Sequence, residues 1–245
     1  MLREYHKWYS HRLGRDMELL VFGHGGPRVI VFPTRQGRFF DYENFGLVAS
    51  LADRLERGVL QLFCVDSVDS ESLYAWYRHP RDRITRHQRF EDYIIEEVVP
   101  LTSLMNPHSH LVAHGCSFGA FHSVNISFRH PDKFGEVVAF SGRYDLTTQL
   151  GPFADLFDGY YDEDIYFHTP NHFVQNLTDN HLLGLLRRMR IVLVIGADDP
   201  FYGSNMRLSH ILNEKSVSHE LYTWDGTAHR ARYWRHMVRH YLVPY

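Results

Sequence analysis

This sequence predicts an α/β fold in which helices cover both faces of a mainly parallel sheet, and three observations predict it. Short, wholly apolar runs such as residues 29–32 and 191–195 are typical of strands buried on both faces. Segments between such runs repeat apolar residues at helical spacing. The first 22 residues favour hairpin-like strands, so an antiparallel start precedes the alternation of strands and helices. A chain of 245 residues can bury a substantial core, and we expect a single domain over residues 1–245.

The first half of the chain is expected to open with a hairpin, whose strands meet at a turn around Gly14. Further on, one helical pattern stops at Gly58, a natural C-terminal cap. A longer helical pattern stops at Pro100, which has no N–H to donate. The elements expected here are strands at 5–10, 16–22, 29–32 and 59–65 and helices at 48–55 and 83–99.

The second half is organised around residues 110–121, where an apolar run ends in Gly115-Cys116-Ser117-Phe118-Gly119 and a helical pattern begins at once. That helix is expected to stop at His130-Pro131, because a residue before proline is driven out of helical conformation. The other elements expected here are strands at 136–140, 191–195 and 219–223, a helix at 206–213 and a terminal helix carrying Tyr233, Met237 and Tyr241.

The strand, sharp turn and helix around Ser117 are the context of a nucleophile elbow, in which a serine sits at the apex of a strained turn. Gly115 and Gly119 fit this interpretation, because a larger side chain at either position would collide with the neighbouring backbone. The turn would expose the Ser117 hydroxyl and set the Phe118 amide at the positive end of a helix. The alternative is a chance occurrence of the motif, against which the flanking strand and helix argue.

Composition narrows the classes of function. A formal charge of −3 gives no reason to expect nucleic acid or an anionic membrane as a partner, and no stretch approaches the length of a membrane span. The two cysteines, Cys64 and Cys116, lie in a strand-like run and in the elbow. A reduced pair suits a cytoplasmic protein better than a disulfide scaffold, so we expect a cytoplasmic protein.

A serine hydroxyl is a poor nucleophile until a base takes its proton, and a histidine base needs an acid to fix its tautomer. In this class of sheet the acid follows the serine along the chain, at a strand's carboxyl end. After Ser117, the strand end at 195–199 offers such an acid. We prefer Asp199 for this role and keep Asp198 as the alternative.

The base is expected at the next strand end. His229 is preceded by the flexible Gly226 and is the only late histidine expected in a loop. His219 begins a strand, and His236 and His240 fall within the last helix. We therefore assign the role of base to His229.

A second set of hydrogen-bond donors for a developing oxyanion is expected in residues 33–37, because this loop follows the buried strand 29–32 at the edge of the sheet where ligands gather. His24-Gly25-Gly26 is reminiscent of a lipase-type oxyanion motif, but it precedes that strand, whereas an oxyanion loop must follow one. An ordinary strand-to-helix loop is the alternative interpretation of residues 33–37.

Two further segments are candidates for pocket walls. Residues 66–72 carry carboxylates and lead into the aromatic residues Tyr74, Trp76 and Tyr77, which suits either a substrate pocket or a surface loop. Residues 144–184 break the strand-helix rhythm, and we expect a lid-like excursion there, with aromatic residues such as Tyr160 or Phe167 shaping the pocket.

The same excursion contains His168 and His172, a spacing that could bind a metal if both lay on one helix. Pro170 falls between them and argues against a regular helix, so we expect no metal.

Residues 115–119, 196–199 and 224–229 together resemble the α/β-hydrolase superfamily. Within it the chain is similar to the esterase D branch, which includes S-formylglutathione hydrolases, feruloyl esterases and mycolyltransferases of the antigen 85 type. The resemblance extends from Asp16 to the C-terminus. S-formylglutathione hydrolases carry a different oxyanion-loop motif, so their substrate is not carried over.

The resemblance implies an α/β-hydrolase fold, with Asp199 as the acid and with oxyanion amides from Phe118 and from Arg35 or Gln36. It implies cleavage of small carboxylic esters through an acyl-serine, without a metal or an organic cofactor. An acyltransferase with the same residues is the first alternative, in which an alcohol or thiol replaces water. A non-catalytic binding protein is the second, and it is disfavoured because all three positions of the triad are filled.

Overall fold

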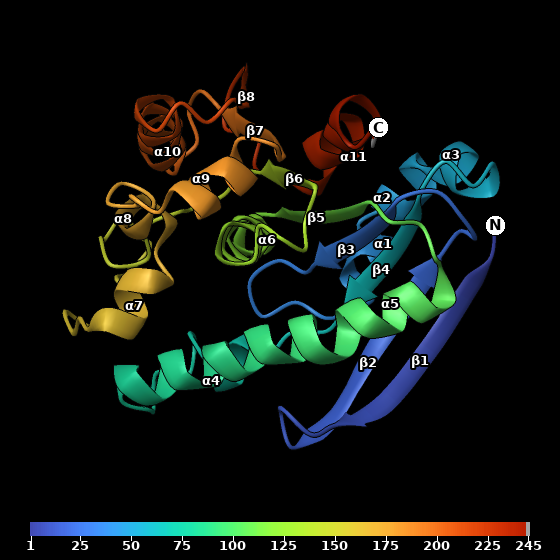
Figure 1. Cartoon of the computed structure of the whole chain (residues 1–245), viewed down its shortest axis with the longest axis horizontal. Coiled ribbons are helices and arrows are strands. Elements are labelled where there is room, and N and C mark those ends of the chain that lie inside the picture. Colours follow the sequence, from blue (N-terminus) through green and yellow to red (C-terminus); the bar gives the residue numbers. More distant parts are fainter. Residues whose placement is uncertain (244–245) are drawn as a thin grey trace.

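The computed structural model describes residues 1–243 and contains an eight-stranded sheet with helices on both faces (Figure 1). The strand order is β1-β2-β4-β3-β5-β6-β7-β8. β2 runs antiparallel to β1 and β4, and every pair from β4 to β8 is parallel. The strands are β1 (Arg3–Ser10), β2 (Arg15–Phe22), β3 (Arg28–Phe32), β4 (Gln61–Val65), β5 (Leu111–Cys116), β6 (Glu136–Phe140), β7 (Arg190–Gly196) and β8 (Glu220–Trp224). The expected α/β class with an antiparallel start is confirmed.

Helices fill the connections between these strands. They are α1 (Asp41–Asn44), α2 (Leu47–Ser50), α3 (Ala52–Glu56), α4 (Pro80–Tyr93), α5 (Val99–Met105), α6 (Phe118–Arg129), α7 (Glu163–Phe167), α8 (Pro170–Phe173), α9 (Asn180–Leu186), α10 (Tyr202–Glu214) and α11 (Ala231–Tyr241). A 3-10 turn covers Asp69–Glu71 and a π-helical segment covers Ile94–Val98. No helix within residues 1–243 is long and apolar enough to cross a membrane.

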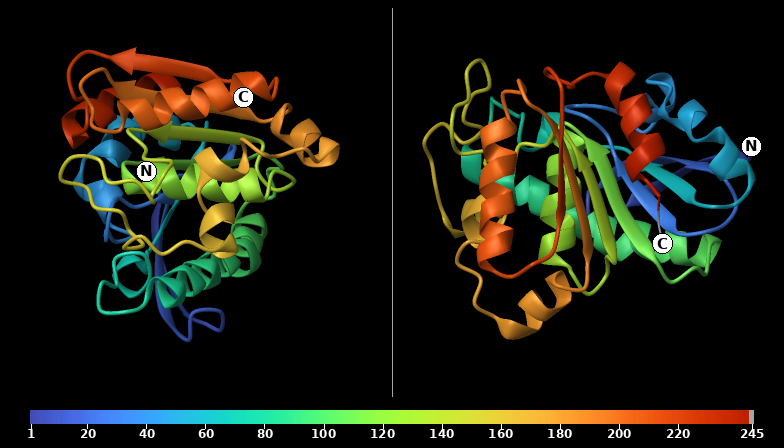
Figure 2. Two further views of the ribbon diagram at one scale, coloured as in Figure 1. Left: turned by 90° about the vertical axis from the view of Figure 1, so that its left-hand side faces the viewer. Right: turned by 90° about the horizontal axis from the view of Figure 1, so that it is seen from above.

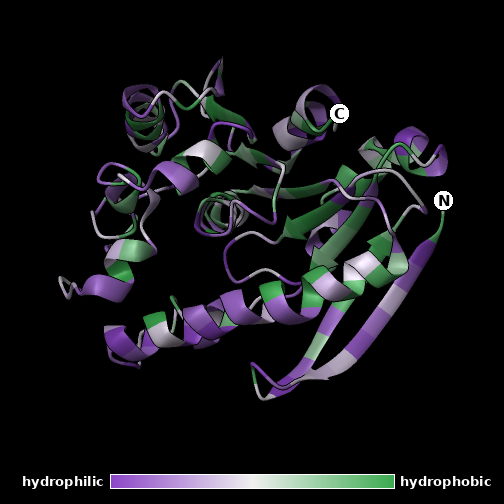
Figure 3. Ribbon diagram, in the orientation of Figure 1, coloured by the Kyte–Doolittle hydropathy of each residue, from purple (hydrophilic) through white to green (hydrophobic). Residues whose placement is uncertain are grey.

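Alternating side chains of the strands divide the core into two layers. Val21 and Ile30 face one layer, with residues of α4, α6 and α10, whereas Leu20 and Val31 face the other, with residues of α2, α3 and α11. This period of two is what a sheet covered on both faces requires. Figure 2 shows the helices on the two sides of the sheet, and Figure 3 shows that the central strands are apolar whereas β1, at the edge of the sheet, is largely polar.

The predicted helix end at Pro100 is wrong, because helical structure continues through α5 to Met105. Pro100 is the second residue of α5 and directly follows the π-helical segment Ile94–Val98. The π-helical segment before it widens the turn and shifts the hydrogen-bond register, so the proline ring is accommodated without ending the run.

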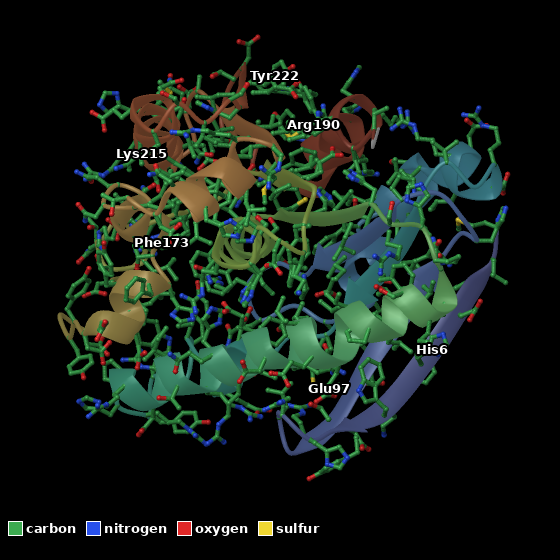
Figure 4. The ribbon with its side chains drawn as sticks, viewed as in Figure 1. His6, Glu97, Phe173, Arg190, Lys215 and Tyr222 are labelled. Carbon is green, nitrogen blue, oxygen red and sulfur yellow. The ribbon has the colours of Figure 1, made fainter. Side chains whose placement is uncertain are left out.

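The π-helical segment also ties this long helical run to the edge of the sheet. Glu97, labelled in Figure 4, accepts hydrogen bonds from Trp8 Nε1 at 2.9 Å and Ser10 Oγ at 2.8 Å. Both donors belong to β1. The antiparallel edge is therefore fixed on the face that carries α4.

Residues 144–184, all of which the structure describes, contribute no strand to the sheet and connect β6 to β7. The segment holds α7, α8 and the first part of α9. Pro170 occupies the first turn of α8, and His168 caps the end of α7, so His168 and His172 do not share one helix. Their partners differ too, as His168 lies 3.6 Å from Glu91 and His172 lies 3.3 Å from Asp145.

Candidate active site

Ser117 stands at the end of β5, immediately before α6, with a backbone φ of 57° and ψ of −118°. A residue other than glycine adopts such a conformation only under strain. A Cβ atom added at Gly115 would lie 2.3 Å from the Gly119 backbone, and one added at Gly119 would lie 2.3 Å from the Phe32 carbonyl oxygen. The expected steric need for both glycines is confirmed, and the turn is as sharp as the motif predicts.

The structure brings Ser117, His229 and Asp199 together in one hydrogen-bonded chain. His229 Nε2 lies 2.9 Å from Ser117 Oγ, and His229 Nδ1 lies 2.7 Å from Asp199 Oδ2. The Asp199 side chain is fully buried, whereas that of His229 is 23% exposed. An imidazole held this way can exchange a proton with the serine while the carboxylate fixes its tautomer.

Local packing positions the acid and the histidine. Asp199 Oδ1 accepts the Phe201 backbone N–H at 2.9 Å, which fixes the carboxylate after β7. A Cβ atom at Gly196 would lie 2.2 Å from the Thr227 carbonyl oxygen, so glycine there allows the histidine loop to approach the end of β7. Ala228, just before His229, has a positive φ of 46° and marks strain in the loop.

The alternative residues lie elsewhere. Asp198 is exposed, and only its backbone N–H reaches the histidine loop, at the Gly226 carbonyl. His219 Nε2 lies 2.6 Å from Ser209 Oγ, on α10. His236 and His240 both lie within α11, as expected from the sequence.

The loop after β3 carries Arg35 and Gln36, the two candidates for the second oxyanion donor, and the hydrogen bonds of their N–H groups distinguish them. The Gln36 N–H donates to Asp69 Oδ2 at 2.9 Å, so this amide is occupied. Among the described residues, neither the Arg35 N–H nor the Phe118 N–H donates a hydrogen bond to a protein atom. Arg35 and Phe118 both line the cavity at Ser117, whereas Gln36 does not.

Asp69 holds this loop through a second buried pair. Its Oδ1 lies 3.0 Å from His122 Nε2, and the two side chains are 1% and 2% exposed. The Asp69 carbonyl also accepts the Tyr74 N–H at 2.8 Å. Asp69 thus links the loop after β3 and a histidine of α6 through its carboxylate, and a wall of the cavity through its backbone carbonyl. In the sequence, Asp69 was only one of several acids in residues 66–72, and nothing singled out His122.

A cavity of about 340 Å³ opens at Ser117. It is lined by Thr34, Arg35, Phe45, Tyr74, Ser117, Phe118, Arg143, Phe153, Phe201, His229 and Trp234. Of the aromatic cluster expected near β4, Tyr74 lines the cavity, while Trp76 and Tyr77 are 48% and 75% exposed. Burial raises the pKa of the Tyr74 hydroxyl, and the Asp69 carboxylate adds to that shift.

The expectation that Tyr160 or Phe167 shapes this cavity is wrong. Phe153 is the residue of the excursion that lines it, and Phe167 lines a separate groove beside Phe128. The sequence reasoning also missed Arg143. Its position directly after Ser141-Gly142, which follow the end of β6, was the available signal, since side chains at strand ends gather at one edge of the sheet.

Comparisons with known proteins agree with this geometry. The family model described as "Putative esterase" matches residues 10–239. A ferulic acid esterase structure superposes with a TM-score of 0.75 at 15% identity, covering 98% of this chain and 96% of its own. The S-formylglutathione hydrolase of Agrobacterium tumefaciens superposes with a TM-score of 0.75 at 14% sequence identity, covering 98% of this chain and 92% of its own. MPT51 of Mycobacterium tuberculosis superposes with a TM-score of 0.71 at 13% sequence identity, covering 97% of this chain and 95% of its own. No curated protein matches the chain.

At sequence identities of 13–15%, these structural matches show only the fold, which is that of the α/β-hydrolases. The family match spans nearly the whole chain and includes the elbow and both partner loops. The chain therefore belongs to the esterase family, in the esterase D-like branch of the α/β-hydrolases, and is a carboxylic-ester hydrolase.

Proposed function

We propose that this protein hydrolyses small carboxylic esters through an acyl-serine formed on Ser117, with His229 as the base and Asp199 as the residue that orients it. The observation that carries the proposal is the chain of hydrogen bonds from Ser117 Oγ to His229 at 2.9 Å and from His229 to Asp199 at 2.7 Å. Because the serine sits at a strained turn beside an open cavity, its hydroxyl can meet an ester carbonyl.

In the first step Ser117 Oγ attacks the ester carbonyl carbon while His229 Nε2 takes its proton. The bond from that carbon to the alcohol oxygen then breaks, and His229 gives the proton to the leaving alcohol. In the second step water attacks the acyl-serine, and His229 takes a proton from the water. The acid leaves, Ser117 Oγ regains the proton, and the enzyme returns to its starting state.

The negative charge that develops on the carbonyl oxygen needs donors. We assign this role to the N–H groups of Phe118 and Arg35, since both residues line the cavity and neither N–H is occupied by a described residue. Gln36 is the weaker candidate because its N–H donates to Asp69. In comparable sites one such donor is worth about 3 kcal/mol of transition-state stabilisation.

The broader organisation is part of the same proposal. We treat residues 1–245 as a single domain in which the excursion 144–184 borders the site through Phe153. We also propose a cytoplasmic protein without a nucleic-acid or membrane partner. Support comes from the net charge of −3 and from Cys64 and Cys116, both buried and unpaired.

The proposal is tested with 4-nitrophenyl esters of graded acyl length. Wild type should cleave short esters best, because the cavity of about 340 Å³ is at the small end for ligand sites. Ser117→Ala should lose turnover, while Ser109→Ala, at an exposed loop position, should keep it. Equal rates for wild type and Ser117→Ala would refute the proposal. Product esters formed on adding alcohols would instead identify the acyltransferase.

A further inference from the structure

Arg143 is a buried cation that borders the same cavity as Ser117 and His229. It follows β6, and only 5% of the residue is exposed. The chemistry proposed for the Ser117 site uses two amides, a hydroxyl, an imidazole and a carboxylate. None of those steps calls for a guanidinium, so the position of Arg143 needs another explanation.

The guanidinium is fixed by neighbouring backbone. Arg143 Nε donates to the Asp145 carbonyl at 2.9 Å, and Nη2 donates to the carbonyls of Thr148 at 2.6 Å and Ala154 at 2.9 Å. Its central carbon also lies 6.0 Å from the centre of the Phe201 ring. Within residues 1–243, Arg143 Nη1 makes no hydrogen bond to a protein atom, so its two N–H groups are left for a ligand.

No carboxylate of the described residues forms an ion pair with Arg143. The two acids that influence it electrostatically are Asp145 and Asp155, and both are engaged elsewhere. Asp145 pairs with His172 at 3.3 Å, and Asp155 accepts the N–H groups of Phe157 and Gly159 at 2.8 and 2.7 Å.

The cavity lining as a whole also has positively charged side chains without carboxylates to balance them. Its residues include two arginines and, among the described residues, no aspartate or glutamate. The second arginine, Arg35, is exposed at the rim with its guanidinium 5.8 Å from the centre of the Tyr74 ring. Asp199 is close by, but its side chain is fully buried behind His229. The cavity is therefore locally positive in a protein whose net charge is −3.

A buried charge without a partner is unfavourable, which is why buried charges are normally paired. Burial lowers the pKa of Arg143, in keeping with this cost, although a guanidinium stays protonated at neutral pH. Because the protein supplies no carboxylate, the partner that best compensates Arg143 is an anion brought in by the substrate. Its charge-assisted hydrogen bonds would be stronger than those of a neutral group.

We propose that this site selects esters that carry a second, negatively charged group, a carboxylate, which Arg143 binds through Nη1 while Arg35 adds charge at the rim. The inference rests on the proposed esterase function at Ser117. It names the substrate class as half-esters of dicarboxylic acids or esters of hydroxy acids, in place of simple alkyl esters.

The test compares two nearly isosteric acyl groups, the mono-4-nitrophenyl ester of adipic acid and the matching ester that ends in a neutral carboxamide. A second pair carries the charge on the alcohol side: the butyrate esters of 3-hydroxybenzoate and of 3-hydroxybenzamide. Their hydrolysis is measured by separating and quantifying the products. In at least one pair, wild type should favour the anionic ester about ten- to a hundred-fold in kcat/KM, the range expected for a charge-assisted hydrogen bond.

Arg143→Gln should bring that preference close to one, and Arg35→Gln should reduce it by a smaller factor. Arg78→Gln, at an exposed position outside the cavity, should leave it unchanged. Should Arg143→Gln fail to fold, competitive inhibition of wild type replaces it: butyrate should inhibit at least tenfold more strongly than butyramide, and Arg35→Gln should narrow that gap.

The outcomes separate this inference from the proposed function. If wild type cleaves neutral esters in a Ser117-dependent way but favours neither anionic ester, the esterase assignment stands and the inference is refuted. A preference that Arg143→Gln leaves intact, or equal inhibition by butyrate and butyramide, also refutes it. If no ester is cleaved, or Ser117→Ala cleaves them as well as wild type, the proposed function itself fails.

Discussion

Two aspartate–histidine pairs stand near the cavity and differ in what surrounds them. In one, Asp199 lies 2.7 Å from His229, whose other nitrogen faces Ser117 Oγ at 2.9 Å. In the other, Asp69 lies 3.0 Å from His122, and its second oxygen accepts the Gln36 N–H at 2.9 Å. The His229 side chain is 23% exposed, whereas that of His122 is 2% exposed.

The difference shows that an aspartate–histidine pair does not by itself make a catalytic site. His229 can exchange protons because its Nε2 faces a hydroxyl at an open cavity. His122 is enclosed by aromatic rings, including Phe118 at 4.8 Å and Phe32 at 6.0 Å between ring centroids. We therefore assign proton transfer to the first pair and positioning of the oxyanion loop to the second.

The largest expected effect comes from removing the exposed histidine. His229→Ala should lower kcat by about 10⁵- to 10⁶-fold, because the serine then has no base. His219→Ala, which alters a histidine bonded to Ser209 outside the cavity, should retain activity within a few-fold. Steady-state kinetics on a 4-nitrophenyl ester measures both. Loss of activity in His219→Ala with a normal His229→Ala would overturn the assignment of the base.

Next in size is the acid of the same pair. Asp199→Asn should lower kcat by about 10⁴-fold, since the amide no longer enforces the right imidazole tautomer. The neighbouring Asp198→Asn is the matched control, and its exposed side chain predicts a change of less than about twofold. The reverse ranking of the two variants would transfer the role to Asp198.

A change in the buried pair, Asp69 and His122, should lower kcat by a smaller factor than a change in the pair of Asp199 and His229. In Asp69→Asn an uncharged amide replaces the carboxylate, so the charge-assisted hydrogen bonds to the Gln36 N–H and to His122 are lost, and His122 can stay bonded only in the other tautomer. We expect kcat to fall about 10- to 100-fold with KM nearly unchanged, less than the full loss of an oxyanion donor. The pH at which activity rises should stay that of wild type. A KM effect alone would contradict a positioning role.

Acid stability sharpens the contrast between partly exposed and enclosed histidines. Burial lowers the pKa of His114 to about 4, only partly opposed by its bond to the Val138 carbonyl, and burial lowers that of His87 as well. Since an unfolded histidine has a pKa near 6.5, protonation favours unfolding. The stability is full above about pH 6.5 and is lost as the pH falls towards 4, by about 2.5 kcal/mol for His114 at pH 4.5.

Urea denaturation at pH 7.5 and pH 4.5 measures this difference. The midpoint should fall on acidification, and the fall should shrink in His114→Gln. His210→Gln is the control, because that side chain is 73% exposed. Equal midpoints at the two pH values in wild type would show that the enclosed histidines do not govern acid stability.

Sequence periodicity was enough for the fold class, because the buried central strands are short apolar runs and helical patterns separate them. It did not predict that α6 is buried on all sides from Phe118 to Phe128. It failed at Pro100, where a π-helical segment absorbs a residue that normally ends a helix. The positions of Ser117, Asp199 and His229 could be predicted since they belong to local motifs at strand ends. His122 could not, because its role depends on a contact with Asp69, which lies 53 residues away in the chain. Arg143 was missed although it follows a strand end, because its local contacts to the carbonyls of Asp145, Thr148 and Ala154 leave no recognisable pattern in the sequence.

The most direct test of the catalytic assignment is labelling by a fluorophosphonate, which reacts with a serine only when its proton can be removed. Wild type should gain one adduct, located by peptide mass spectrometry on the segment that contains Ser117, and His229→Ala should react far more slowly. Ser117→Ala should remain unlabelled while keeping the wild-type urea midpoint. Equal labelling of wild type and Ser117→Ala, or an adduct on another serine, would contradict the account.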